Sequence, residues 1–183
     1  TLDYYRTLAS STNVPVVGYY IPGLTGQVWS IDRMVEVLKI DNVAGFKFTH
    51  TDLYMLERVM SHIGREKVVY FGVDEMLCHG VACGAHGGIG TTYNFMPKLI
   101  LEVATLSAEG RWEEARKVQK KVNEIIEVLL TCHGLAATKQ ILVWQGHITS
   151  ARCAPPRASL TAGRQTSLRA KLLQTAIADT LIK

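Results

Sequence analysis

The chain has 183 residues, 48% of them hydrophobic and 20% charged, a composition typical of a folded globular chain and not of a disordered or fibrous one. Its formal net charge of +4 is too mild to predict a nucleic-acid partner. Its apolar runs are too short for a transmembrane helix, and Asp3 and Arg6 argue against a secretory signal. We therefore expect a cytoplasmic chain without nucleic-acid or membrane partners, whose four cysteines are reduced.

Short apolar strands alternate with helical patterns through the first part of the chain. The strands are expected at residues 14–21, 43–49, 67–73 and 85–92, and helices should follow from Ser30, Asp52, Asp74 and Phe95. This order predicts parallel strands joined by helical crossovers. Residues 3–11 resemble the tail of a helix from an earlier unit, so the pattern fits the second half of a (β/α)8 TIM barrel, which takes roughly 250 residues.

The pattern becomes wholly helical after residue 107. Helices are expected at 111–130, 135–144 and 167–182, with a loop at 150–163. We expect one domain, with a half TIM barrel in residues 1–107 and a C-terminal helical region in residues 108–183. The four side chains that could suggest a metal site do not have zinc-site spacing, and we read them as a packed helix and its exit turn: Cys78, His79, Cys83 and His86.

Lys47 is the first candidate for chemistry. Side chains alternate along a strand, and the bulky Phe46 and Phe48 should face the helices, which turns Lys47 inward near the C-terminal end of its strand. Only the neutral amine of a lysine attacks a carbonyl carbon, and an apolar enclosure favours that form. The position fits an imine-forming lysine, although the spacing alone favours an ordinary ion-paired lysine or one at a sheet edge.

Polar side chains near the ends of the neighbouring strands are further candidates. Tyr19 could carry a proton near an imine, or simply pack its ring and bond its hydroxyl to the backbone. Asp74 and Glu75 could accept hydrogen bonds from the hydroxyl groups of a polyol, or favour the start of a helix. The glycine-rich residues 84–91 could approach an anion or a helix closely, with the Thr91 hydroxyl beside them.

Four segments that occur in order carry a family resemblance. They are YYIP at 19–22, GFKFT at 45–49, GVDE at 72–75 and GIGTTYN at 88–94. Together they resemble the dihydrodipicolinate synthase/N-acetylneuraminate lyase family of class I aldolases, from Thr1 to about Ile141. The lyase branch fits better, because Leu24 stands where synthases carry an arginine that binds a dicarboxylic substrate.

The resemblance implies Schiff-base retro-aldol cleavage of sialic acid to N-acetylmannosamine and pyruvate, a carbon–carbon lyase activity. Lys47 would form the imine and Tyr19 would help to move a proton from the C4 hydroxyl. The positions that would line the sugar site are Thr49, Gly72, Asp74, Glu75 and Thr91. No metal or organic cofactor is implied, since the imine is itself the electron sink, and the family suggests a homotetramer.

The family's front half, which holds the substrate carboxylate, is absent from these 183 residues. We therefore expect this chain alone to be inactive or nearly so. Two alternatives stay open: a related pyruvate-dependent aldolase acting on another 2-keto sugar acid, and a non-catalytic truncated isoform that associates with full-length subunits.

Overall fold

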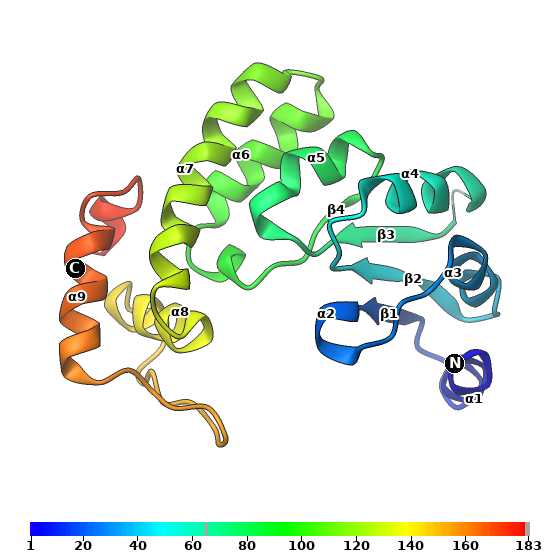
Figure 1. Ribbon diagram of the computed structural model, residues 1–183, viewed down its shortest axis with the longest axis horizontal. Helices are drawn as coiled ribbons and strands as arrows, with labels where there is room; N and C mark the ends of the chain where they lie inside the picture. Colours follow the sequence, from blue (N-terminus) through cyan, green and yellow to red (C-terminus); the bar gives the residue numbers. More distant parts are fainter. Residues whose placement is uncertain (65, 182–183) are drawn as a thin grey trace. The chain divides into compact units, whose positions relative to one another are not determined.

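The computed structural model describes residues 1–64 and 66–181, which divide into two units (Figure 1). The first unit runs from Thr1 to Ile89 and the second begins at Gly90. The first unit contains α1 (Leu2–Ser10), β1 (Val16–Tyr20), α2 (Pro22–Thr25), α3 (Ile31–Leu38), β2 (Val43–Phe48), α4 (Leu53–His62), β3 (Val68–Phe71), η1 (Asp74–Met76), α5 (Leu77–Ala82) and β4 (Gly87–Gly88). The division expected after residue 107 remains a prediction based on the change from strand–helix repeats to helices.

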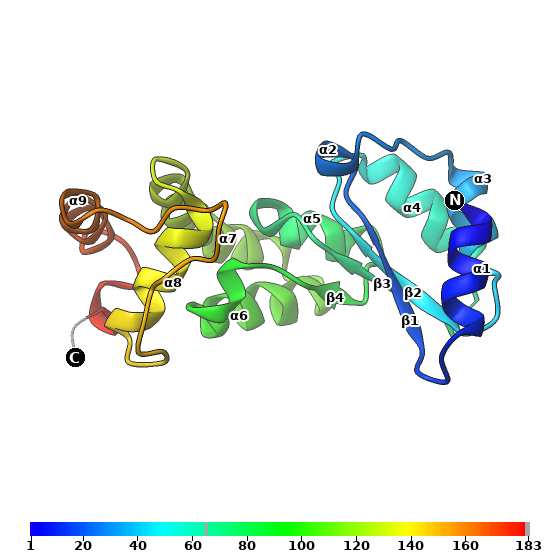
Figure 2. The ribbon, with the colours of Figure 1, turned by 90° about the horizontal axis from the view of Figure 1, so that it is seen from below.

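The strands form one parallel sheet in the order β1-β2-β3-β4, which confirms the predicted α/β class. Figure 1 shows the strand arrows pointing the same way, and Figure 2 shows β1 and β2 side by side with α1 alongside. The register aligns Tyr19 with Lys47 and Lys47 with Tyr70. The C-terminal ends of these strands, where barrel enzymes place their chemistry, therefore lie together.

The hydrophobic core of the first unit lies on one face of the sheet. Its buried side chains come from α1, α3, α4 and the outward-facing positions of the strands, and include Tyr5, Met34, Leu38, Phe46, Phe48, Leu56, Val69 and Phe71. Two helices begin where predicted, each with a side-chain cap. The Ser30 hydroxyl accepts from the Arg33 N–H, and the Asp52 carboxylate accepts from the Met55 N–H. These caps fix where α3 and α4 begin against the core.

The opposite face of the sheet is open in the described part of the chain. On β1, Val17 is 45% exposed and Tyr19 is 48% exposed, although both point away from the helices. Of the described strands, only β2 pairs with β1 and only β3 pairs with β4, so both outer strands have a free edge.

Asn42 ties the start of β2 to the connection between α1 and β1. Its side-chain amide lies 3.0 Å from the carbonyl oxygen of Ala9, 2.7 Å from that of Thr12 and 3.1 Å from that of Val14. Its backbone is left-handed, with φ of +62°. Asparagine tolerates this conformation better than most residues, so Asn42 serves both the turn and the contact.

Two strands of the first unit are shorter than predicted. The strand expected at 14–21 is β1 at Val16–Tyr20, and Pro22 then begins the short helix α2, whose C-terminal cap is Gly26 with φ of +66°. The strand expected at 85–92 is reduced to the two residues of β4. Before β4, the His86 ring takes a position that a backbone carbonyl would hold in a regular strand pair. Its Nδ1 accepts a hydrogen bond from the Val69 N–H at 3.1 Å.

The second unit is helical, as predicted. It contains η2 (Thr92–Asn94), α6 (Pro97–Ala108), α7 (Trp112–Leu130), α8 (Gly134–Trp144), α9 (Ala162–Leu172) and η3 (Ala178–Thr180). Its core includes Val103, Ala115, Val122, Ile125, Ile141, Leu168 and Leu172. Among the described residues no single helix is long and apolar enough to cross a bilayer, and α7 with α8 reaches that length only as a pair bent by 112°.

The last helix lies earlier than the predicted 167–182. It begins at Ala162, in the segment expected to be a loop, and ends at Leu172. The Thr175 hydroxyl donates to the Leu172 carbonyl oxygen at 2.7 Å, a local bond that competes with further helix. Ile182, the predicted end, lies outside the described residues.

Candidate active site

Lys47 occupies the inward-facing position predicted for it. Phe46 and Phe48 on either side are fully buried against the helices, whereas Lys47 is partly buried on the opposite face. Its neighbours across the strands are Tyr19 on β1 and Tyr70 on β3. The alternation of side chains along β2 therefore places Lys47 between Tyr19 and Tyr70 in the register of the sheet.

The amine of Lys47 contacts the phenol of Tyr19 directly. The Nζ atom donates a hydrogen bond to the Tyr19 Oη at 3.2 Å and lies 4.4 Å from the centre of the ring. Because the phenol oxygen can accept and donate protons, the lysine amine stands next to a group that is able to carry a proton. This arrangement is suited to imine chemistry.

Thr49 and Gly72 complete a small group around the lysine side chain. A Cβ at Gly72 would collide with Thr49 Oγ1 and lie 2.9 Å from Lys47 Cε, so glycine is the residue that leaves room here. Thr49 Oγ1 is buried and has no hydrogen-bond partner among the described residues. A buried hydroxyl without a partner is costly, and a ligand oxygen at this place would satisfy it.

Asp74 and Glu75 form the first turn of η1, immediately after β3. Asp74 is buried and 8% exposed, while Glu75 is exposed. The two carboxylates therefore have different surroundings, and Asp74 is the one held inside the fold. Acidic residues in a first turn also favour the start of a helix, so both sequence readings of this pair remain compatible with its place.

Thr91 lies in the second unit, where it precedes η2 and its carbonyl oxygen accepts from the Asn94 side-chain amide at 2.9 Å. The structure does not assign Thr91 to the group around Lys47. The glycine-rich residues before it form β4, which pairs with β3. Gly84, with φ of +93°, makes the turn that leads from α5 into this segment.

The cysteine and histidine residues near α5 take the predicted helix-and-turn arrangement. Cys78 lies in the helix and Cys83 is its C-terminal cap, and all four cysteines of the chain are free. Within residues 1–64 and 66–181, no three His, Cys, Asp or Glu side chains lie close enough together to hold a metal ion.

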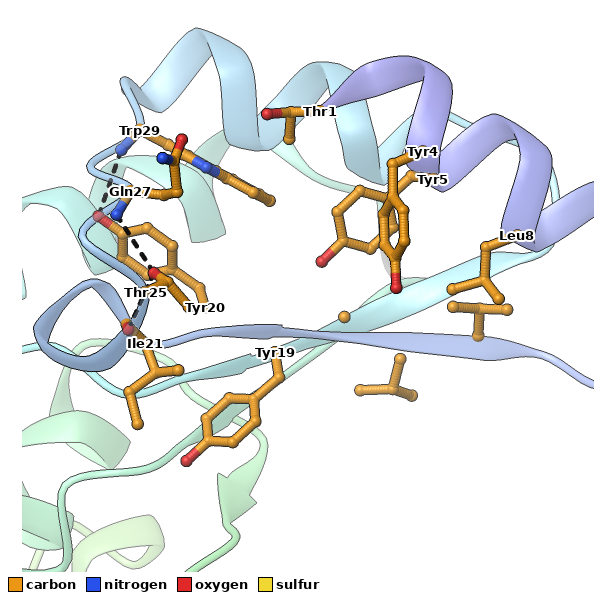
Figure 3. Close-up of a pocket in the computed structure, with 13 residues that line it drawn as sticks. Thr1, Tyr4, Tyr5, Leu8, Tyr19, Tyr20, Ile21, Thr25, Gln27 and Trp29 are labelled. Carbon is orange, nitrogen blue, oxygen red and sulfur yellow. Dashed lines mark hydrogen bonds between the residues drawn. The ribbon is translucent and has the colours of Figure 1, made fainter.

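A cavity of about 510 Å³ lies along the free edge of β1, between α1 and residues 25–29 (Figure 3). Tyr4, Tyr5, Tyr20 and Trp29 are among the aromatic side chains that line it. Tyr19 lines this cavity too, but Lys47 does not. The cavity therefore borders the candidate site, and Lys47 is not among the residues that line it.

A tyrosine beside Lys47 was not predicted from the sequence. Tyr70 stands beside Lys47 in the register, a position that alternation with the buried Val69 and Phe71 in β3 could have revealed. Tyr5 of α1 lines the cavity together with Tyr19 and packs against Phe46. This contact joins two elements, and the sequence carries no local signal for it.

Comparison with known proteins identifies a family for this chain. The family model described as "Dihydrodipicolinate synthetase family" matches residues 1–175. The N-acetylneuraminate lyase of Rhizobium meliloti (strain 1021) is 39% identical over 141 residues, which cover 77% of this chain and 46% of that protein. The chain thus spans about half the length of the curated relatives it matches.

Solved structures of this family have the same fold. CdNal from Clostridium difficile, solved in complex with mannosamine, has a TM-score of 0.87 and 28% identity, covering 95% of this chain and 59% of that one. The dihydrodipicolinate synthase of Aquifex aeolicus has a TM-score of 0.88 at 21% identity, covering 100% and 61%, and supports the fold alone. The chain belongs to the dihydrodipicolinate synthetase family of pyruvate-dependent class I aldolases and corresponds to the C-terminal part of its barrel.

Proposed function

We propose that this chain carries the Schiff-base-forming part of an N-acetylneuraminate lyase, with Lys47 as the nucleophile and Tyr19 as the proton carrier. The observation that carries the proposal is the 3.2 Å hydrogen bond from Lys47 Nζ to Tyr19 Oη on the inward face of the sheet. Neither side chain is needed there for packing, because the core lies on the other face.

The first step is formation of the imine. The neutral Lys47 amine adds to the C2 ketone of the open-chain sugar acid and gives a carbinolamine. Tyr19 then donates its proton to the carbinolamine hydroxyl, which leaves as water. The products are a protonated imine on Lys47 and an ionised Tyr19 oxygen, which the adjacent positive charge stabilises.

The second step breaks the carbon–carbon bond. The Tyr19 oxygen takes the proton of the C4 hydroxyl, the C3–C4 bond breaks, and its electrons pass into the protonated imine to form an enamine. The C4 fragment leaves as the aldehyde of N-acetylmannosamine. Tyr19 returns the proton to C3, and water hydrolyses the resulting imine to release pyruvate and restore both side chains.

Several features support a sugar acid as the substrate. Leu24, 80% exposed on α2, supplies no charge for a second carboxylate. The unpartnered hydroxyl of Thr49 and the carboxylates of Asp74 and Glu75 suit a polyhydroxylated chain. The similar proteins are named as N-acetylneuraminate lyases, and one was solved with mannosamine. We include Thr91 in the sugar site on the resemblance alone.

A homotetramer in the cytoplasm is part of the same proposal, supported by the family and by the four free cysteines. Because the chain spans about half of its relatives' length, we expect it to form the imine but to be inactive, or nearly so, in turnover. A related aldolase acting on another 2-keto sugar acid is the alternative that shares this site. A non-catalytic chain that associates with full-length subunits is the alternative that does not use it.

Reductive capture separates these alternatives. The chain is incubated with cyanoborohydride and either N-acetylneuraminate or a 2-keto-3-deoxy sugar acid without an acetamido group, and the intact mass is measured. We expect half-maximal capture at a lower concentration of N-acetylneuraminate. Preferential capture of the other acid would favour the related aldolase, and no capture of either would favour the non-catalytic chain.

A further inference from the structure

Tyr70 lies next to Lys47 on the inward face of the sheet, on the side away from Tyr19. The strand β3 lies between β2 and β4 (Figure 1), and the register places Tyr19 on one side of Lys47 and Tyr70 on the other. Val69 and Phe71 are fully buried in the core, so the alternation of β3 turns Tyr70 to the face that carries Lys47. Because neighbouring strands are about 4.8 Å apart, the two side chains stand beside each other.

The backbone around Tyr70 is fixed by the pairing of β3 with the segment of β4. The carbonyl oxygens of the residues before and after Tyr70 accept backbone hydrogen bonds from that segment, at 2.9 and 3.0 Å. The partner of Tyr70 in the register is Gly87. The nearest atom to a Cβ placed on Gly87 is Tyr70 Cδ1, at 3.9 Å. The ring therefore lies against a position of β4 that carries no side chain.

The side chain of Lys47 extends toward the C-terminal ends of the strands. Its Cε atom is 2.9 Å from a Cβ placed on Gly72, which is the next inward-facing position of β3 after Tyr70. Its Nζ atom lies 3.2 Å from the Tyr19 Oη. A bulky ring is thus followed on β3 by a position without a side chain, and Lys47 passes over the second of the two.

We propose that Tyr70 is a positioning residue for the aldolase reaction, whose ring keeps the Lys47 side chain over Gly72 and its amine beside the Tyr19 phenol. A lysine side chain is flexible, and a ring of fixed position limits its freedom before the substrate arrives. This inference rests on the proposed function, since it concerns the amine that forms the imine. Tyr70 acts through Lys47, and the ring and not its hydroxyl is the part that acts.

The rate of imine trapping with pyruvate measures this effect. Lys47 Nζ bonds to pyruvate C2 and the ketone oxygen leaves as water. Cyanoborohydride then delivers hydride to C2, and the resulting secondary amine is counted by intact mass. A misplacement of about 1 Å can lower a rate by about 10²-fold, and we expect Tyr70→Ala to lower the second-order rate constant of trapping roughly tenfold. Tyr70→Phe keeps the ring and should trap at the unmodified rate.

Val68→Ala is the matched control. Val68 is the preceding inward-facing residue of β3, is half-buried like Tyr70, and pairs with Gly45 and not with Lys47. It should leave trapping unchanged. Tyr70→Val removes the ring but keeps a residue that suits a strand, and it should also slow trapping, so the test does not depend on the folding of the alanine variant. Normal trapping by Tyr70→Val, slow trapping by Tyr70→Phe, or an equal loss in Val68→Ala would overturn the proposal.

NMR follows the contact between Lys47 and Tyr19 without any chemistry. Lys47 Nζ lies 4.4 Å from the centre of the Tyr19 ring, so the ε-methylene protons of Lys47 should give an NOE to the ring protons. Tyr70→Val should weaken this NOE, whereas Tyr70→Phe and Val68→Ala should keep it. An NOE of full strength in Tyr70→Val would overturn the positioning role. Absence of any Lys47 adduct in the unmodified chain would instead refute the proposed function, and the NOE result would still stand.

Discussion

The amine of Lys47 and the phenol of Tyr19 share a hydrogen bond of 3.2 Å across the paired strands β1 and β2. The two residues are directly opposite in the register, so the contact follows from strand pairing and does not depend on a loop. Sites built on strands are held more precisely than sites on loops. Substitutions that disturb this row of the sheet should therefore affect chemistry before they affect folding.

Gly72→Ala should damage the site by crowding it. The new methyl group would meet Thr49 Oγ1 and lie 2.9 Å from Lys47 Cε, which we expect to lower stability by about 1–3 kcal/mol and to reduce imine trapping with pyruvate. Gly23→Ala is the control, because a Cβ there has no neighbour within 4 Å. Equal trapping by Gly72→Ala and Gly23→Ala would show that the space at Gly72 is not needed.

Asn42 should contribute to stability in two separable ways. Asn42→Gly removes the side-chain contacts to the α1–β1 connection but keeps the left-handed turn, and should cost about 1–3 kcal/mol. Asn42→Ala should cost about 1 kcal/mol more, because alanine resists a φ of +62°. Urea denaturation measures both, and an alanine variant as stable as the glycine variant would contradict the backbone part of this account.

Asp52 should stabilise α4 as its N-terminal cap. Its carboxylate accepts the Met55 N–H at 2.8 Å, so Asp52→Ala should lower the unfolding free energy by about 1 kcal/mol. Asp52→Asn keeps an oxygen acceptor and should lower the unfolding free energy by only about a few tenths of 1 kcal/mol. If both variants lose the same amount in urea denaturation, the negative charge and not the cap is responsible.

Cys83 should react slowly as a nucleophile at neutral pH. Burial, and to a smaller extent the carboxylate of Glu57, raises the pKa of the Cys83 thiol above its ordinary value. Because the thiolate is the reactive form, the pH midpoint of its alkylation by iodoacetamide should lie above about 8.5, and Glu57→Gln should lower it. Peptide mass spectrometry resolves Cys83 from the other cysteines, and a midpoint at or below that of a free thiol would refute the assignment.

The sequence predicted those parts of the fold that depend on neighbouring residues. The alternation of Phe46, Lys47 and Phe48 determines which face each side chain takes, and the structure confirms it. Ser30 and Asp52 were recognisable as helix starts, and their side-chain oxygens accept from the free N–H groups there. The lengths of β1, β2 and β3 were predicted to within a few residues, because short apolar runs mark the strands.

Other features depend on contacts that no local pattern encodes. The glycine-rich β4 is shorter than predicted, since His86 bonds to β3 through its ring and the turn begins at Gly84. The ring contact between Tyr5 and Phe46, at 5.8 Å between ring centres, joins a helix to a strand, and only the packing of α1 reveals it. The roles assigned to Thr49, Gly72, Asp74, Glu75 and Thr91 came from resemblance, and they remain predictions.

Peptide mapping after borohydride reduction in the presence of pyruvate tests the central chemistry most directly. The account predicts a reduced pyruvate adduct on the peptide that contains Lys47, and no adduct at that peptide in the Lys47→Arg variant. Arginine keeps a positive charge at this position but forms no such imine, so the comparison isolates the amine. An adduct on a different lysine, or an unmodified Lys47 peptide in the unaltered chain, would contradict the account.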